Sequence, residues 1–127
     1  MIFGVGTDIV DIERIERSME RHGEKFAERI LASVEMEFYQ QTKNKINYLA
    51  KRFAAKEAVS KALGTGMRQG IDFVQLVIIN DEIGKPKVSL EGKAREWAEQ
   101  QSITTIHLSI SDEKKYAVAF AIAESKR

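Results

Sequence analysis

Apolar and polar positions follow different periods in the two halves of the chain. Residues 2 to 10 alternate β-branched or aromatic residues with small ones, which predicts a strand close to the first residue. From residue 11 to residue 63 apolar residues recur every three or four positions, which predicts several helices. Asp11 can cap the first helix and Ser33 a later, shorter one, because both side chains accept hydrogen bonds from the free amides of a first turn.

The longest predicted helix begins near Ile46 and ends at Gly64. Its second half, within Arg52–Gly66, is rich in Ala, Leu, Lys and Glu, which are good helix formers, and glycine is the residue that a left-handed helix end prefers. A salt-bridged surface and a binding site both explain the polar stripe that this half carries beside its apolar one. The stripe consists of Glu57, Ser60, Lys61 and Gly64.

The second half of the chain has the shorter period of strands. Strands are predicted over residues 73–79, 87–90, 104–111 and 116–123, with a turn at 80–86 and a short amphipathic helix over 91–101. Alanines alternate with bulky residues in the last strand, so its small-residue face permits a helix or another subunit to pack close. The whole pattern predicts one α+β domain over residues 1–127, with a mainly antiparallel sheet, a long helix and several short helices.

The composition limits the class of protein. With 43% hydrophobic and 31% charged residues, the chain is typical of a soluble domain. A net charge of +1 gives no overall attraction to nucleic acid or membranes, and no apolar run approaches the ~20 residues of a membrane span. The absence of cysteine excludes disulfides, thiol catalysis and thiolate zinc sites. Together with a start that lacks a signal-peptide pattern, this is compatible with a cytoplasmic protein.

Charged residues of the first predicted helices fall into an acidic row and a neighbouring basic row. The basic row consists of Arg14, Arg17, Arg21 and Lys25. Pairs across the rows, such as Glu13 with Arg17, contribute only ~0.2–0.5 kcal/mol each. The rows are therefore either a solvated helix face or a basic ridge for an acidic helical partner.

Gly64-Thr65-Gly66 invites comparison with nucleotide-binding loops, but its context differs. The standard phosphate loop opens a helix, whereas these glycines close one, at the end that carries a partial negative charge. A phosphate bound here would need Lys56 or Lys61 and a divalent cation. Asp8, near the end of the first strand, and Glu57 are the best-placed carboxylates for Mg²⁺, which proteins hold with one or two carboxylates, phosphate oxygens and water. Either carboxylate can equally be a solvated surface group.

The two histidines differ in their surroundings. His22 lies among charges and is typical of a surface residue. His107 shares a strand face with Ser109 and Ser111, which is unusual in an otherwise apolar strand. An edge strand and a binding site both explain this polar face. No nucleophile turn supports a Ser/His/Asp triad.

Four segments of the chain resemble the motifs of holo-acyl-carrier-protein synthases, the short phosphopantetheinyl transferases. The central motif is highly specific, the other three are weak singly, and all four follow the family order between residues 4 and 112. They are Gly6-x-Asp8, the nearly complete central motif from Arg52 to Gly66, Gly84-Lys85-Pro86, and His107-x-Ser109-x-Ser111.

The resemblance implies the 4′-phosphopantetheinyl transferase fold and a Mg²⁺-dependent transfer of 4′-phosphopantetheine from coenzyme A to a serine of apo acyl carrier protein. Adenosine 3′,5′-bisphosphate is released, and the reaction supports fatty acid biosynthesis. Family members of this size are homotrimers with active sites between subunits, which would suit the alanine-rich face of the last strand. Because carrier proteins are acidic and helical, the basic ridge gains a role, with Arg14, Arg21 and Lys25 as docking candidates.

The resemblance and the residue chemistry together give a hypothesis for each site residue. Asp8 and Glu57 hold Mg²⁺, and Glu57 and Lys61 are the catalytic residues, with Lys61 neutralising an oxygen of the pyrophosphate. The serine proton passes to Glu57 or to a water on the metal, and the sequence leaves both routes open. His107 and Ser109 are open to contribution from a neighbouring subunit. The residues expected to bind coenzyme A are Lys56, Ser60, Lys61, Gly64, Thr65, Gly66, Pro86, His107 and Ser109.

Two positions depart from the patterns of relatives. Val10 stands where the larger two-domain relatives have a further acidic residue, which leaves that metal ligand to water. Asp112 stands where some short members have a histidine, so no role of that histidine carries over. Two rival functions remain: a Mg²⁺-dependent hydrolase that splits the coenzyme A pyrophosphate with water, and a non-catalytic oligomeric binding protein that uses the charged helix as an interaction face.

Overall fold

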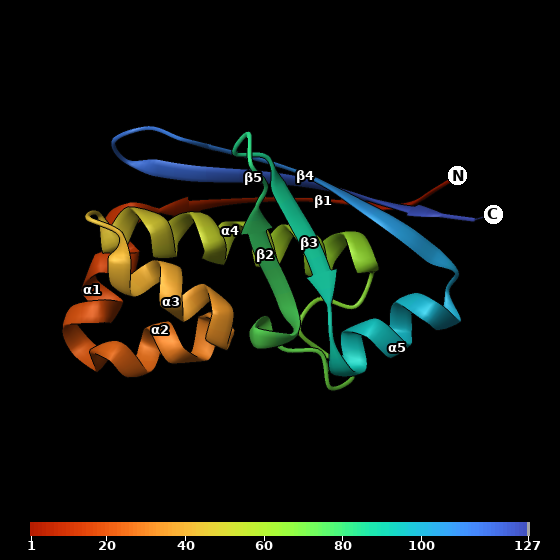
Figure 1. Ribbon diagram of the computed structural model, residues 1–127, viewed down its shortest axis with the longest axis horizontal. Helices are drawn as coiled ribbons and strands as arrows, with labels where there is room; N and C mark the ends of the chain where they lie inside the picture. Colours follow the sequence, from red (N-terminus) through yellow and green to blue (C-terminus); the bar gives the residue numbers. More distant parts are fainter. Residues whose placement is uncertain (127) are drawn as a thin grey trace.

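The core of the molecule is one long helix, α4, packed along a three-stranded antiparallel sheet (Figure 1). The structure is a computed structural model and describes residues 1–126. The α+β class expected from the sequence pattern is confirmed. In chain order the elements are β1 (Ile2–Asp11), α1 (Ile12–His22), α2 (Glu24–Ile30), α3 (Ser33–Gln41), α4 (Lys45–Leu63), the 3₁₀ helix η1 (Phe73–Gln75), β2 (Leu76–Asn80), β3 (Pro86–Leu90), α5 (Gly92–Gln100), β4 (Ile103–Asp112) and β5 (Tyr116–Ser125).

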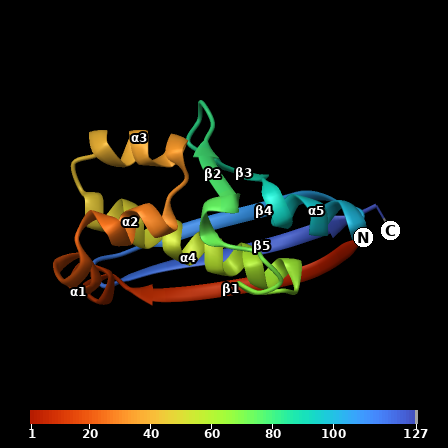
Figure 2. The same ribbon diagram turned by 90° about the horizontal axis from the view of Figure 1, so that it is seen from below.

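The elements are arranged around α4. Strand β5 lies at the centre of the sheet, between β1 and β4, and α4 covers one face of that sheet. Helices α1, α2 and α3 gather at one end of α4 (Figure 2). The β2–β3 hairpin forms a second sheet beside β4, and α5 lies toward the other end of the molecule. Within residues 1–126, no helix covers the opposite face of the three-stranded sheet.

Helix α4 approaches the sheet closely because both surfaces are built from small residues. A Cβ at Gly6 would overlap the carbonyl oxygen of Ala58, and one at Gly4 would overlap that of Ala62. The predicted small-residue face is therefore filled by a helix of the same chain, and the alternative, a neighbouring subunit on this face, is wrong. Four alanines of β5 are buried under α4: Ala117, Ala119, Ala121 and Ala123.

Two helix boundaries, at Gly23 and at Ala32, differ from those predicted from the sequence. Gly23 has a φ of 64°, so the helical pattern between residues 11 and 31 is divided into α1 and α2. The cap predicted at Ser33 is wrong, because Ala32 occupies the N-cap and Ser33 already lies in α3. The amide of Ala32 instead donates to Glu35 Oε1 at 2.8 Å, an interaction between a helix start and a side chain inside the helix.

Two aspartates end the extended segments that precede a helical turn. Asp11 caps α1 as predicted, with its Oδ1 accepting from the amide of Glu13 at 2.9 Å. Asp72 accepts from the amide of Phe73 at 2.7 Å and starts the turn η1, so residues 73–75 of the predicted strand are helical and β2 begins at Leu76.

Replacement of Gly6 by alanine tests the close approach of β1 to α4. We expect Gly6→Ala to lower the free energy of unfolding by about 2 kcal/mol or more, because overpacking a rigid backbone contact forces the strand and helix apart. Denaturant unfolding followed by circular dichroism measures this change. The control is Thr7→Ala on the exposed face of the same strand; equal stability of the two variants would contradict the interpretation.

Candidate functional site

The contact between β1 and α4 brings Asp8, Glu57 and Lys61 together. Asp8 pairs with Ala119 across the sheet and so points toward the face that α4 covers. Lys61 Nζ lies 2.9 Å from the carbonyl oxygen of Thr7 and 3.3 Å from Asp8 Oδ1. The side chain of Asp8 is 18% exposed and that of Lys61 51% exposed, so the group is open to solvent on one side. The structure thus joins the first motif to the central one.

Glu57 is the group whose ionisation this arrangement changes. Partial burial raises its pKa above the ordinary value of 4.5, and the negative charge of Asp8 raises it further. The positive charges of Lys61 and Arg14 oppose this shift. Two carboxylates that repel each other at a solvent-open position are suited to a hard cation such as Mg²⁺. No third His, Cys, Asp or Glu joins them among residues 1–126, so further ligands would be water or substrate oxygens.

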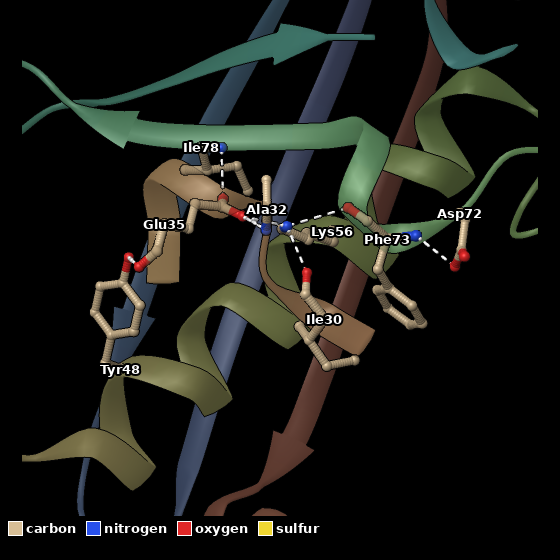
Figure 3. Close-up of polar contacts among 8 residues, drawn as sticks. All are labelled: Ile30, Ala32, Glu35, Tyr48, Lys56, Asp72, Phe73 and Ile78. Atoms are coloured by element: carbon tan, nitrogen blue, oxygen red, sulfur yellow. Dashed lines mark hydrogen bonds and ion pairs between the residues drawn. The ribbon is translucent and has the colours of Figure 1, made fainter. Parts of the chain in front are cut away.

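Lys56, which sequence reasoning placed at coenzyme A, lies instead in the core (Figure 3). Its Nζ donates to Glu35 Oε1 at 2.5 Å, to the carbonyl oxygen of Ile30 at 2.6 Å and to that of Phe73 at 3.1 Å. Burial lowers the pKa of Lys56, while the charge of Glu35 opposes that shift. Because all three of its donors are used inside the fold, Lys56 has none to offer a ligand, and we leave it out of the proposed site.

Ser60 and the turn Gly64-Thr65-Gly66 make hydrogen bonds within the fold, which limits the groups they can offer to a ligand. Ser60 is fully buried, and its Oγ donates to the carbonyl oxygen of Glu57 at 2.8 Å. Gly64 ends α4 in the left-handed conformation predicted for it, with a φ of 89°. The amide of Gly66 donates to the carbonyl oxygen of Ser60 at 3.0 Å, and the side chain of Thr65 is buried. Of these residues, Gly64 is the most open to a ligand.

His107 and Ser109 do not meet the carboxylates within one chain. They pair with Ile122 and Phe120 across the sheet, and Phe120 is exposed on the face opposite α4. His107 Nε2 lies 2.8 Å from Glu124 Oε1 on that same face. Since alternate residues of a strand point to opposite faces, Asp8 and the pair His107–Ser109 lie on different sides of the sheet.

A cavity with a volume of about 570 Å³ lies between β3, β4 and α5. Pro86 and His107 both line it, so the third and fourth motifs are neighbours in space. Asp8 and Glu57 do not line it. The cavity and the pair of carboxylates are therefore separate features of the chain.

Arg52 is a functional candidate to which the sequence reasoning assigned no role. Its guanidinium lies 4.6 Å from the centre of the Tyr48 ring, and its buried Nε has no hydrogen-bond partner within residues 1–126. It lines a small hollow together with Lys51 and Pro86. An unused buried donor beside a positive charge favours an anionic ligand. Arg52 is the first residue of the central motif, and this position is the feature of the sequence that could have indicated a role.

The predicted basic ridge is exposed at one end of the site. Arg14, Arg21 and Lys25 are all exposed, while Arg17 is paired with Glu13 at 3.0 Å. Arg14 is close enough to Glu57 to lower its pKa, so the ridge begins beside the carboxylates. A groove of about 410 Å³ lies among α2, α4 and η1. It is lined mainly by apolar side chains, Phe26, Ile30, Phe53, Phe73 and Val74, together with the charged Glu28, Arg29 and Asp72.

Comparisons with known proteins identify the family of the chain. A family model described as the 4′-phosphopantetheinyl transferase superfamily matches residues 4–121. A holo-[acyl-carrier-protein] synthase of Aliivibrio fischeri (strain MJ11) is 56% identical over 124 residues, which cover 98% of each chain. The crystal structure of a holo-[acyl-carrier-protein] synthase from Neisseria meningitidis has a TM-score of 0.93 at 46% identity, covering 98% of this chain and 100% of that one.

The structure of a third relative is a complex with a ligand. The holo-(acyl-carrier-protein) synthase from Bacillus anthracis, in complex with coenzyme A (3′,5′-ADP), has a TM-score of 0.84 at 38% identity, covering 99% of both chains. The chain therefore belongs to the 4′-phosphopantetheinyl transferase superfamily, a family of transferases. Among the described residues, none of the helices combines the length and the apolar character that a membrane span requires.

The electrostatic coupling of the two carboxylates is directly measurable. In the metal-free protein, Asp8→Asn should lower the pKa of Glu57, because it removes a neighbouring negative charge, while burial keeps the pKa above 4.5. Because a raised pKa means that the folded chain binds this proton more tightly, the metal-free protein should lose stability as the pH rises from 4.5 through the raised value. Glu57→Gln should remove that loss.

An NMR titration of the Glu57 carboxyl measures the first shift, and thermal unfolding at a series of pH values measures the second. Asp11→Asn, at the exposed end of the same strand, is the control. An equal downward shift in that variant would contradict a specific coupling between Asp8 and Glu57.

Proposed function

We propose that the chain transfers 4′-phosphopantetheine from coenzyme A to a serine of apo acyl carrier protein and releases adenosine 3′,5′-bisphosphate. The observation that carries this proposal is the meeting of Asp8, Glu57 and Lys61 at the contact between β1 and α4, in a chain of this family. The relatives named above are holo-acyl-carrier-protein synthases, and one of them binds coenzyme A. The proposed setting is fatty acid biosynthesis in the cytoplasm.

Mg²⁺ fits the residues present. Asp8 and Glu57 would hold it, and their mutual repulsion is the feature that a cation would relieve. When bound, the metal supplies positive charge against the pyrophosphate as the bond to the leaving phosphate breaks. Val10, which stands where larger relatives have an acid, is buried and offers no ligand.

Lys61 is placed to act on the same pyrophosphate. Its ammonium has three donors, of which two are directed to Thr7 and Asp8, so one remains for a non-bridging phosphate oxygen. Its charge would also offset that of the leaving bisphosphate. The proton of the attacking serine would pass to Glu57 or to a water beside it.

The nucleotide end of coenzyme A is proposed to span two subunits. His107, Ser109 and Pro86 are assigned to it, but the first two lie on the opposite side of the sheet from Asp8 in the same chain. A neighbouring copy resolves this conflict. On β1 and β5 the outer face of the sheet exposes apolar side chains, as a subunit interface would: Val5, Ile9, Tyr116, Val118 and Phe120. These two features support an assembly of copies with its active sites between subunits, which we propose to be a homotrimer.

Arg52 and the glycine turn complete the proposed coenzyme A site. Arg52 has an unused donor and shares its hollow with Pro86, so we add it as a phosphate ligand. Gly64 and Gly66 would let the nucleotide approach the end of α4. Ser60 and Thr65 are buried, so their contribution would come through the backbone and through the shape of the turn.

The carrier protein is proposed to dock on the ridge of Arg14, Arg21 and Lys25. The ridge is exposed and begins beside Glu57, so an acidic helix bound to it would present its serine near the reaction centre. The apolar groove around Phe26 and Phe53 lies alongside and would receive apolar side chains of the partner.

One intact-mass measurement tests the proposed reaction. Incubation of the protein with apo carrier protein, coenzyme A and Mg²⁺ should add ~340 Da to the carrier protein, the mass of the phosphopantetheine group. Glu57→Gln and Asp8→Asn should each abolish the Mg²⁺-dependent addition and leave the circular dichroism spectrum unchanged. Release of bisphosphate from coenzyme A without carrier protein would show a hydrolase instead. Normal turnover by either variant would refute the metal assignment.

Kinetics of ridge variants test the docking surface. Arg14→Ala and Arg21→Ala should each raise the KM for the carrier protein roughly three- to ten-fold and weaken its salt dependence, because each removes one attractive charge. The KM for coenzyme A should not change. Arg17→Ala is the matched control, since Arg17 is already paired with Glu13. A comparable loss of coenzyme A affinity in Arg21→Ala would exclude the ridge as a carrier-protein surface.

A further inference from the structure

A buried ion pair, Glu35 with Lys56, joins five segments of the chain (Figure 3). Lys56 Nζ binds the last carbonyl of α2, at Ile30, and the first carbonyl of η1, at Phe73, in addition to Glu35. Glu35 Oε1 also accepts from the amide of Ala32, and Oε2 accepts from the amide of Ile78 at 2.7 Å. The pair therefore fixes α2, α3, α4, η1 and β2 to one another.

Both charges are fully buried, and no solvent satisfies them. Removal of such a pair in favour of apolar residues often leaves stability unchanged, so stability alone does not explain its presence. What a charged pair with directional hydrogen bonds provides is a fixed geometry. Each backbone group on the cation is a carbonyl, and each on the anion is an amide, so this arrangement of the five segments satisfies the donors and acceptors of the pair.

The geometry that the pair fixes is that of the proposed docking side. Ile30 and Phe73, whose carbonyls bind Lys56, both line the apolar groove, and Phe73 stacks on Phe53 with ring centres 5.4 Å apart. Lys25, at the end of the basic ridge, lies on α2, the helix whose last carbonyl binds Lys56. Loss of the pair would free the walls of the groove and one end of the ridge.

The metal side of α4 is held by other contacts. Lys56 is followed directly by Glu57, so the anchor and the proposed metal ligand point in different directions from one helical turn. The position of Glu57 over β1 is set by the close packing of Gly4 and Gly6 against α4, in which the ion pair has no part. Two independent contacts thus hold two sides of the same helix.

We infer that Glu35 and Lys56 are positioning residues, which hold the carrier-protein surface in register with the reaction centre on α4. The inference rests on the proposed function, since it assumes that a carrier protein docks on α1 and α2. It deepens that function by adding two residues that touch neither substrate. Their loss affects the use of the carrier protein and leaves the binding of coenzyme A intact.

The test replaces both charges together, because a single replacement would leave the other charge buried and unpaired. Glu35→Gln combined with Lys56→Met should raise the KM for the carrier protein at least ten-fold. The Kd for coenzyme A with Mg²⁺, measured by calorimetry, should stay within two-fold of wild type. Hydrogen exchange should accelerate at the amides of Ala32 and Ile78 and stay slow in β1.

Leu76→Ala is the matched control, since it removes a buried side chain of β2 that lines neither the groove nor the ridge. It should lower the melting temperature and leave the carrier-protein KM unchanged. If Leu76→Ala lowers the melting temperature as much as the double variant does and raises the carrier-protein KM equally, the effect of the ion pair is one of stability alone, and the inference is wrong. An unchanged KM in the double variant would overturn the inference.

Two further results are possible: the double variant does not fold, or the wild-type chain is inactive. If the double variant does not fold, Glu35→Asp decides, because it keeps both charges but shortens the anchor. A three-fold or greater rise of the carrier-protein KM with coenzyme A binding intact supports positioning, and no rise overturns it. Failure of the wild-type chain to modify any carrier protein would instead refute the proposed function, and with it the premise of the inference.

Discussion

The close approach of α4 to β1 is the constraint on which the site depends. Without side chains at Gly4 and Gly6, the carbonyls of Ala58 and Ala62 lie against the strand, and no other residue fits there. That contact sets Asp8 beside Lys61 and within electrostatic reach of Glu57. The glycine of the first motif is therefore as much a part of the site as the aspartate that follows it.

Charge is distributed over α4 according to depth. On its outer edge, Glu57 and Lys61 keep contact with solvent, where a polyanionic substrate and a cation can reach them. In the interior, Lys56 is enclosed by carbonyl groups and by Glu35, and serves the fold. Two lysines five residues apart in one motif thus have opposite environments, and only burial separates their roles.

Periodicity predicted the class of fold and nearly every strand and helix, because the apolar faces of these elements are regular. It did not predict the break at Gly23 or the cap at Ala32, which depend on a backbone angle and on a hydrogen bond to Glu35. The structure places Asp8 close enough to Glu57 to raise its pKa, as the predicted metal site requires, while the metal itself stays a prediction. The burial of Lys56 and the unused donor of Arg52 were not visible, because both result from distant segments packing around them.

The two faces of the sheet have a consequence for how much active enzyme a solution would contain. Asp8 points to one face, and His107 and Ser109 point to the other, so one folded chain holds two unlike halves of the proposed site. The number of complete sites would then follow the mass action of subunits and not the number of folded chains. Dilution would therefore lower the activity per chain. A subunit that lacks its own carboxylates would still complete the site of the subunit beside it.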